Sequence, residues 1–323
     1  MKPPAAALLL LSILASGGYC SFWPFSGKGD IGLLDNAKRS FEKGEYRTVI
    51  EEVNGLLDQR LSQDTKAEAY WYLGSSYEAA GELDRALNTY QLAMHLYPDN
   101  DRFLLALAEL YSRIGLYDRA RPLFEEALVR NPADSRAHAS LAATFEKLGF
   151  LSRSAGHYRS ALKERGGTAE LLKSYARCLS KQRNFTEAEE AARKALSLSP
   201  DAPELWILLA SISAGRGSFA EAAEQAERAD RLSGGNREII LRKALWMASA
   251  GDWKGAVLNA ERMLAKNPAD RLAIWTKAVA LIRAGEKEKA RLLLKKIASS
   301  ENSFLSASAT AMAGALESRK NAK

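Results

Sequence analysis

Three histidines, His95, His138 and His157, are the side chains of this chain best suited to binding a metal ion or transferring a proton. None of them stands three or four residues from another histidine, and no cysteine lies near any of them in the sequence. A zinc site needs three or four such ligands, so the ligands for one are missing. We therefore expect structural histidines, no metal site and no cofactor.

Other stretches that suggest catalysis have simpler explanations. Residues 214–217 and 233–236 are rich in glycine, but a phosphate-binding loop follows a β-strand, and the residues before both stretches have a helical pattern. Pairs of glutamates at 125–126 and 189–190 also stand in helical stretches, where we expect them to face solvent. The sequence therefore predicts that this protein is not an enzyme.

Side chains suited to binding are concentrated in residues 169–182. There Lys173, Arg177 and Lys181 recur every four residues, so that in a helix they share one face. The apolar residues of the same stretch form a separate packed stripe, which consists of Leu172, Tyr175, Ala176 and Leu179. Equivalent places elsewhere in the chain supply the other candidates for a partner-binding groove. These are the basic residues Arg113, Arg136 and Lys147 and the apolar residues Ile207, Leu241, Leu245, Trp275 and Val279.

Two interpretations of the apolar candidates are open. They either pack one structural repeat against the next, or they form a hydrophobic lane beside the basic residues. A groove of the second kind would bind a peptide or a helix through its apolar anchors and an acidic flank. We therefore expect a protein or peptide partner with acidic and apolar character.

The elements that position these side chains come from an internal repeat with a fixed period. Residues 67–100 form the first copy and residues 101–134 the second, and five further copies follow as far as residue 304 without an inserted or deleted residue. A fixed period of this size is typical of a stacked array, in which each unit depends on its neighbours for a core.

Each copy has the pattern of two amphipathic helices joined by a turn, with apolar residues at spacings of three and four. The first helix carries a small residue at a matched place in every copy: Gly74, Ala108, Ala142, Ala176, Ala210, Ala244 and Ala278. The turn carries Gly81, Gly115, Gly149, Gly217, Gly251 and Gly285, because a chain that leaves a helix here needs a left-handed backbone. Arg183 replaces this glycine in the fourth copy, and we expect Asn184 beside it to adopt the left-handed conformation.

We call each set of equivalent positions in successive copies a column. These columns, together with prolines at 98, 132, 200 and 268 that end the second helix, resemble the tetratricopeptide repeat. The resemblance covers most of the chain. It implies an all-α fold, a right-handed superhelical solenoid of helical hairpins with a C-terminal capping helix, in which the first helices line the concave surface. The carboxylate clamp of the family, which uses lysine and asparagine at set places on successive first helices, is not reproduced in this sequence.

The N-terminus has the pattern of an export signal. Lys2 precedes an apolar run at residues 5–15, which has the length of a signal-peptide core and is too short for the ~20 residues of a membrane-spanning helix. We assign residues 1–20 to a signal peptide, cut after the small residues at 15–17. Two alternatives stay open, an uncleaved anchor and lipidation of Cys20 as in a bacterial lipoprotein, although Tyr19 is larger than the lipoprotein pattern prefers.

The remaining segments flank the array. Residues 21–29 form a linker whose three aromatic side chains are either part of a plain tether or an anchor at a membrane surface. We assign residues 30–66 to a degenerate first repeat, shifted by three residues from the main register, and expect residues 64–66 to lengthen the connection that follows. Residues 305–323 have the pattern of a capping helix and a polar tail.

The charge of the chain is +7 and is unevenly distributed. Residues 67–100 carry five acidic side chains against Arg85 alone, whereas residues 271–323 carry eleven basic and four acidic ones. Without a nucleic-acid-binding motif we expect no nucleic-acid partner, and attraction to an acidic protein, anionic lipid or polysaccharide instead. Cys178 has no disulfide partner if Cys20 is removed or lipidated, and we expect it to be a buried apolar side chain.

Together these patterns predict a non-enzymatic scaffold that is exported, either to the periplasm or to the outer membrane through an N-terminal lipid. We expect it to bind a partner segment in its concave groove as part of a bacterial cell-envelope assembly or secretion complex. The alternative is a glycan-handling protein of a polysaccharide-export or cell-wall system, because the array also resembles repeat domains found there.

Overall fold

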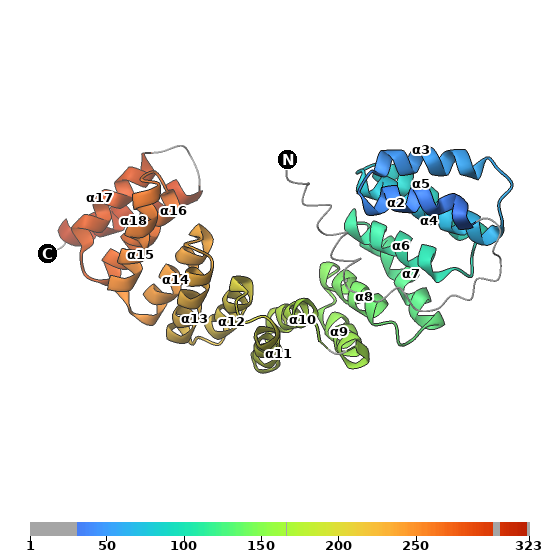
Figure 1. The fold of residues 1–323 in the computed structure, drawn as a ribbon. Helices are drawn as coiled ribbons and strands as arrows, with labels where there is room; N and C mark the ends of the chain where they lie inside the picture. The colour runs from blue at the N-terminus through green and yellow to red at the C-terminus, as the bar shows by residue number, and fades with distance from the viewer. Residues whose placement is uncertain (1–30, 166, 300–303, 322–323) are drawn as a thin grey trace. The chain divides into compact units, whose positions relative to one another are not determined.

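The computed structural model describes residues 31–165, 167–299 and 304–321, and this part of the chain is built from α-helices with no β-strand. The signal peptide and linker assigned to residues 1–29 lie outside the described residues. The prediction of an all-α repeat solenoid is confirmed (Figure 1). Within the described residues no helix is both long enough and apolar enough to cross a membrane.

The chain divides into two compact units, Met1–Phe150 (unit 1) and Leu151–Lys323 (unit 2). Unit 1 contains the 3₁₀ helix η1 (Ile31–Leu34) and α2 (Asp35–Glu42), α3 (Tyr46–Leu57), α4 (Gln63–Ala79), α5 (Leu83–Leu96), α6 (Asp101–Arg113), α7 (Tyr117–Arg130) and α8 (Ser135–Lys147). Unit 2 contains α9 (Leu151–Arg165), α10 (Ala169–Lys181), α11 (Phe185–Leu198), α12 (Pro203–Gly215), α13 (Phe219–Leu232), α14 (Arg237–Ala250), α15 (Trp253–Lys266), α16 (Arg271–Arg283), α17 (Lys287–Ala298) and α18 (Phe304–Asn321). Even-numbered helices up to α16 are the first helices of their repeats, and odd-numbered helices up to α17 are the second helices.

The first helices begin at residues that cap their free backbone N–H groups. Asn100, Asp134 and Asp270 each stand one residue before a first helix, and each side chain accepts a hydrogen bond from the opening turn. Ser62 does the same for α4, so residues 64–66 form the first turn of this helix. The expectation that these residues lengthen the connection is therefore wrong, because the cap starts the helix before the repeat register does.

The turns between paired helices use a left-handed residue, as expected, but one of them uses an unexpected residue. Gly115 has φ 85°, and the N–H group of Leu116 donates to the Tyr111 carbonyl at 2.8 Å. At the equivalent turn Arg183 itself has φ 63°, whereas Asn184 has φ −82° and precedes α11. The assignment of the left-handed conformation to Asn184 is wrong, because the hydrogen bond that closes each helix fixes which residue must turn.

The small-residue column allows the helices of a hairpin to pack closely. At Gly74 an added Cβ would lie 2.4 Å from the ring of Tyr90, so this ring, which packs directly on the glycine, would have to shift if position 74 carried a side chain. The Tyr90 hydroxyl is hydrogen-bonded to Ser75 and to Glu78, both at 3.1 Å. Burial raises the pKa of Tyr90 well above its usual value, so this phenol stays protonated.

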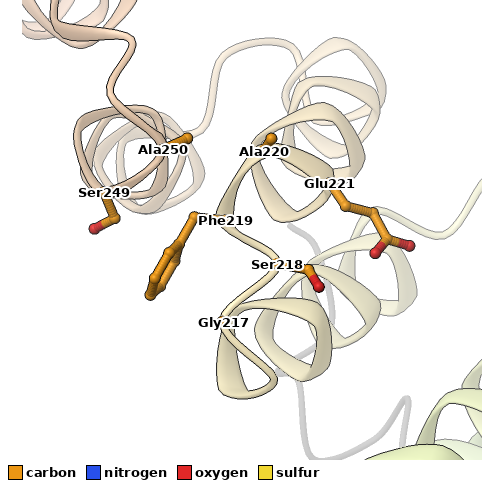
Figure 2. A pocket seen from close by; sticks show the side chains of 7 residues that line it. All are labelled: Gly217, Ser218, Phe219, Ala220, Glu221, Ser249 and Ala250. Carbon is orange, nitrogen blue, oxygen red and sulfur yellow. The ribbon is translucent and has the colours of Figure 1, made fainter.

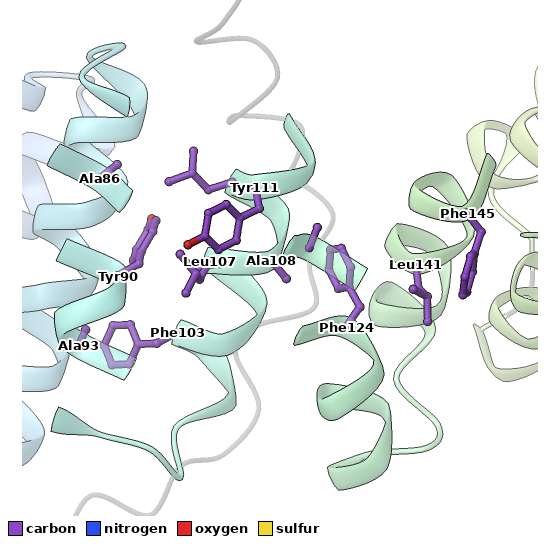
Figure 3. Packing of buried hydrophobic residues seen from close by; sticks show 13 residues of the cluster. Ala86, Tyr90, Ala93, Phe103, Leu107, Ala108, Tyr111, Phe124, Leu141 and Phe145 are labelled. Atoms are coloured by element: carbon purple, nitrogen blue, oxygen red, sulfur yellow. The ribbon is translucent and has the colours of Figure 1, made fainter. Parts of the chain in front are cut away.

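The core of unit 1 runs through four successive helices (Figure 3). Its members are Ala86, Tyr90 and Ala93 on α5, Phe103, Ala106, Leu107, Ala108, Leu110 and Tyr111 on α6, Ala120 and Phe124 on α7, and Leu141 and Phe145 on α8. Because each helix contributes side chains to both of its neighbours, the hairpins stabilise one another.

Candidate partner-binding surface

Within each unit, first helices of successive hairpins come into contact with one another. In unit 2, α10 contacts α12 and α14 contacts α16, in addition to the contacts that each makes with its own second helix. In unit 1, α6 contacts α8 in the same way. Side chains that leave α14 and α16 away from the second helices therefore lie on one surface, and the same holds for the pair α10 and α12 and for the pair α6 and α8.

The basic candidates of unit 1 are partly used in packing. Arg113 is paired with Glu78 at 2.5 Å, and the guanidinium of Arg136 binds the carboxylate of Glu109, with 2.6 Å for its Nε. Each pair joins two first helices, so it links one hairpin to the next. Lys147 is exposed at the C-terminal end of α8.

The basic stripe of unit 2 lies on α10. Lys173 is half-buried and paired with Glu170 at 2.5 Å, whereas Arg177 and Lys181 are exposed. The packed stripe of the same helix, Leu172, Tyr175, Ala176 and Leu179, is buried. The two basic side chains that reach solvent are therefore carried by a helix whose opposite side is fixed in the core.

A hydrogen-bonded cluster behind α10 holds this helix in place. The Tyr175 hydroxyl donates to Glu187 on α11, and the Glu187 carboxylate also accepts from Arg159 at 3.2 Å and from Asn184 at 2.8 Å. Burial and this carboxylate raise the pKa of Tyr175 to about 12. The bond from Tyr175 lowers the pKa of Glu187, so at neutral pH the phenol is protonated and the carboxylate is ionised.

The apolar candidates differ in how much they are used in packing. Ile207, Leu241 and Trp275 are half-buried, and each packs against a cluster of core residues. Val279 is also half-buried. Leu245 on α14 differs from them, because 43% of it is exposed.

Sequence reasoning missed a second exposed leucine. Leu272 on α16 is 41% exposed. It stands in the first turn of its helix, at the repeat position that Glu170, Glu204 and Glu238 occupy in the three preceding hairpins. The switch from glutamate to leucine in this column is the signal that would have identified it. We call Arg177, Lys181, Leu245 and Leu272 together the first-helix face of unit 2.

Two buried ionic networks were also missed. Glu189 is buried, and its carboxylate is bound by Arg193 and Arg216. The expectation that the pair at 189–190 faces solvent is therefore wrong for Glu189, whose place on α11 borders the packed face. Its charge is offset by the two guanidinium groups.

The second network lies between α13, α14 and α15. The ammonium of Lys243 donates to Asp230 at 2.6 Å and to Glu227 at 2.8 Å, and Arg262 donates to Asp230 at 2.5 Å. Lys243 and Asp230 are almost fully buried, with side chains 3% and 2% exposed. Burial works against ionisation of Asp230, but the hydrogen bonds from Lys243 and Arg262 outweigh it and keep the pKa of Asp230 below its usual value.

The described residues offer little to a small ligand or a metal ion. A shallow open hollow of about 470 Å³ lies between residues 217–221 and the end of α14, where the ring of Phe219 stands near Ser249 (Figure 2). Among the described residues no group of three or more His, Cys, Asp or Glu side chains is arranged to hold a metal ion. Cys178 is buried, with its sulfur 3.3 Å from the Ser154 hydroxyl.

Comparison with known proteins gives a consistent result. Two family models, both described as tetratricopeptide repeat, match the sequence, one over residues 77–144 and the other over residues 34–101 and 176–237. No curated protein matches the chain.

Several solved structures share the fold. The C-terminal part of a tetratricopeptide repeat-containing protein from Cytophaga hutchinsonii matches with a TM-score of 0.64 and 14% identity, over 75% of this chain and 98% of that one. PilW, a type IV pilus biogenesis factor, matches with a TM-score of 0.58 and 18% identity, over 66% and 98% of the two chains. YrrB, described as having an unusual peptide-binding site, matches with a TM-score of 0.50 and 16% identity, over 57% and 95%.

At these identities the structures establish a common fold, and the family models extend over more than half of the sequence. Tetratricopeptide-repeat proteins are typically protein-interaction scaffolds without catalytic activity. The repeat columns, the paired helices and the family matches agree, and this chain belongs to the tetratricopeptide-repeat family.

Proposed function

We propose that this protein is a scaffold that binds a segment of a partner protein on the first-helix face of unit 2. The observation that carries the proposal is the exposure of Leu245 and Leu272 on α14 and α16, two first helices in direct contact. Leucines left in solvent on adjacent helices can bury their side chains only against another molecule, because the helices that carry them are already packed.

The chemistry of the partner follows from the rest of this face. Arg177 and Lys181 are exposed on α10, the first helix two hairpins before α14, and their positive charges attract carboxylates. The partner segment therefore combines apolar anchors, which fit the leucines, with acidic side chains nearby. Leu245 occupies the same repeat position as Arg177, two hairpins later, so the column changes from basic to apolar along the unit.

Peptide selection tests this chemistry before the partner is identified. A library of displayed random peptides is selected against the full chain, and the affinity of the enriched sequences is measured by fluorescence anisotropy. We expect enriched peptides with leucine or aromatic anchors and several acidic residues. The double variant L245E/L272E should bind them at least about tenfold more weakly, as expected when an anchor is lost at an interface.

A matched control separates the first-helix face from general surface chemistry. L258E/L292E introduces the same two changes on second helices of the same unit, and it should bind the selected peptides like the parent. Folding is preserved in the test variant because position 272 carries glutamate in three other hairpins and position 245 carries arginine in one. Equal losses in both variants, or enriched peptides without acidic residues, would show that the site is elsewhere or of another kind.

We also propose that the scaffold works in a bacterial cell envelope, with support from the apolar run at residues 5–15. The intact mass of the mature protein tests this. A chain that starts at Gly18 or Ser21 supports secretion, and a start at Cys20 with added acyl mass supports a lipoprotein. A full-length mass in the cytoplasmic fraction would contradict export.

A further inference from the structure

Two leucines on the outer side of unit 2 are more exposed than those of the first-helix face. Leu258 on α15 is 67% exposed and Leu292 on α17 is 64% exposed. They stand one repeat period apart, so they occupy the same place in successive hairpins. Both helices are second helices, and α15 packs on α14 and α16 while α17 packs on α16 and α18 (Figure 1). The leucines therefore leave the unit on the side opposite to the first-helix face.

The same repeat position is acidic earlier in the unit. It carries Glu190 on α11 and Glu224 on α13, and both are exposed. An outward column that tolerates glutamate in two hairpins has no packing reason to become leucine in the next two. The change thus points to a contact outside the unit, since a leucine in this place keeps most of its apolar surface in water and gains no neighbour in the fold.

Exposed lysines lie on the same two helices as these leucines. Lys254 stands one turn before Leu258, Lys296 stands one turn after Leu292, and Lys266 ends α15. In the part of the chain that the structure describes, these three lysines have no carboxylate within ion-pair distance. Two nearby carboxylates are already neutralised, because Glu261 is paired with Lys277 and Glu288 with Arg291. We call Leu258, Leu292, Lys254, Lys266 and Lys296 the outer leucine patch.

We propose that the outer leucine patch docks unit 2 onto an anionic lipid bilayer. Lysine side chains at such a surface hold their charges at the level of the lipid phosphates while their alkyl chains lie along apolar material. The leucines between them enter the boundary between headgroups and acyl chains. The complementary charge of anionic lipid is what selects this occupant over a neutral membrane.

A bilayer fits this surface better than a peptide does. The two leucines come from different helices on the outer side of the unit, and the shallow hollow near Phe219 is lined by other residues. A bilayer presents a flat, deformable face that leucines from two different helices can enter together, and its anionic headgroups match the charge of the lysines beside them. With this patch on the bilayer, the first-helix face is on the side of the unit that stays accessible to a partner.

Vesicle co-sedimentation of the full chain tests the proposal. The probes are vesicles that mix phosphatidylcholine with anionic phosphatidylglycerol, and vesicles of phosphatidylcholine alone. We expect binding to the anionic vesicles that weakens at high salt. L258E/L292E should lower the partition coefficient at least about tenfold, and K254E/K296E should lower it by roughly fivefold or more for each lysine. The charge-matched control K163E/K194E, on α9 and α11, should bind like the parent.

Because all variants carry the same apolar N-terminal run, a local probe shows which surface meets the lipid. Leu258→Cys in a Cys20→Ser background is labelled with an environment-sensitive fluorophore, and Glu224→Cys serves as the matched position one hairpin earlier. Cys178 is buried and stays unlabelled. We expect a blue shift on anionic vesicles from the label at 258 and none from the label at 224.

Several results would overturn the proposal. One is the absence of a blue shift from the label at 258 when the chain sediments with the anionic vesicles. Others are equal binding to neutral vesicles, and equal binding by the parent and both patch variants. If the control K163E/K194E loses as much binding as K254E/K296E, the attraction depends on net charge and not on this patch. None of these results bears on the peptide selection, which uses the other side of the unit.

Discussion

Replacing Lys243 with methionine tests the buried ionic network of unit 2 and has a magnitude that follows from its contacts. The ammonium of Lys243 supplies two charged hydrogen bonds, to Asp230 at 2.6 Å and to Glu227 at 2.8 Å. Breaking a buried ion pair by removing one partner costs about 3–5 kcal/mol. Arg262 still binds Asp230 in the variant, so we expect Lys243→Met to cost about 2–4 kcal/mol.

Native-state hydrogen exchange of α13 and α14 measures this cost locally, which matters because a chain of two units need not unfold in one step. The exposed Lys254→Met is the control and should change the opening free energy by less than about 0.5 kcal/mol. The double variant Lys243→Met/Asp230→Leu should recover most of the loss, because no buried charge is left without its partner. A loss below about 1 kcal/mol in the single variant would show that the network is hydrated and contributes little.

Three further predictions address packing, pH and association. Ala188 is fully buried in the close contact between α10 and α11, so Ala188→Trp should cost roughly 1–3 kcal/mol or more in thermal or urea unfolding, and an unchanged midpoint would mean that the column is misassigned. Hydrogen bonds from Arg237 lower the pKa of Asp270, so its contribution to stability is present above the unfolded value near 4 and is lost as pH falls through the lower folded value. Asp270→Asn should therefore flatten the acid side of the stability curve, and an equally steep curve would contradict this. Arg177→Glu/Lys181→Glu should mainly slow association with a selected peptide and remove its salt dependence, whereas a change confined to dissociation would argue against electrostatic steering.

The architecture was predictable because the same two-helix pattern of small, apolar and turn residues recurs in seven copies. The role of a small residue such as Ala108 or of a turn glycine such as Gly115 is clear from the equivalent residues in the other copies. Where one copy departs from the pattern, its neighbours still indicate the structure. Arg183 shows the limit of this reasoning. The repeat predicts that the turn forms despite the arginine, but the hydrogen-bond register of the helix end decides which residue takes positive φ.

The site was less predictable, because the exposure of a side chain depends on its ion-pair and packing neighbours within the chain, and these differ between copies. Glu189 shares a helix with exposed Glu190, and it is buried only because Arg193 and Arg216 reach it. Lys243 looks like a surface lysine until Asp230, on the preceding helix, is placed beside it. Such pairs are specific to one hairpin junction and leave no periodic signal.

Leu272 could have been found from the sequence, since its column changes from glutamate to leucine. The half-burial of Ile207 or Trp275 could not have been predicted from the sequence, because it depends on how closely the next hairpin packs. A residue that departs from the type shared by the other copies at its repeat position is thus a better guide to a binding surface than the shared residue type.

Site-specific photocrosslinking in cells that produce the full chain tests the proposed binding face most directly. A photoreactive phenylalanine derivative is placed at position 245 on the first-helix face, and at position 224 on the second-helix side of the same unit as the matched control. We predict that irradiation yields a discrete adduct with one partner protein from position 245 and none from position 224. An adduct from position 224 with none from position 245 would contradict the account and move the partner to the second helices.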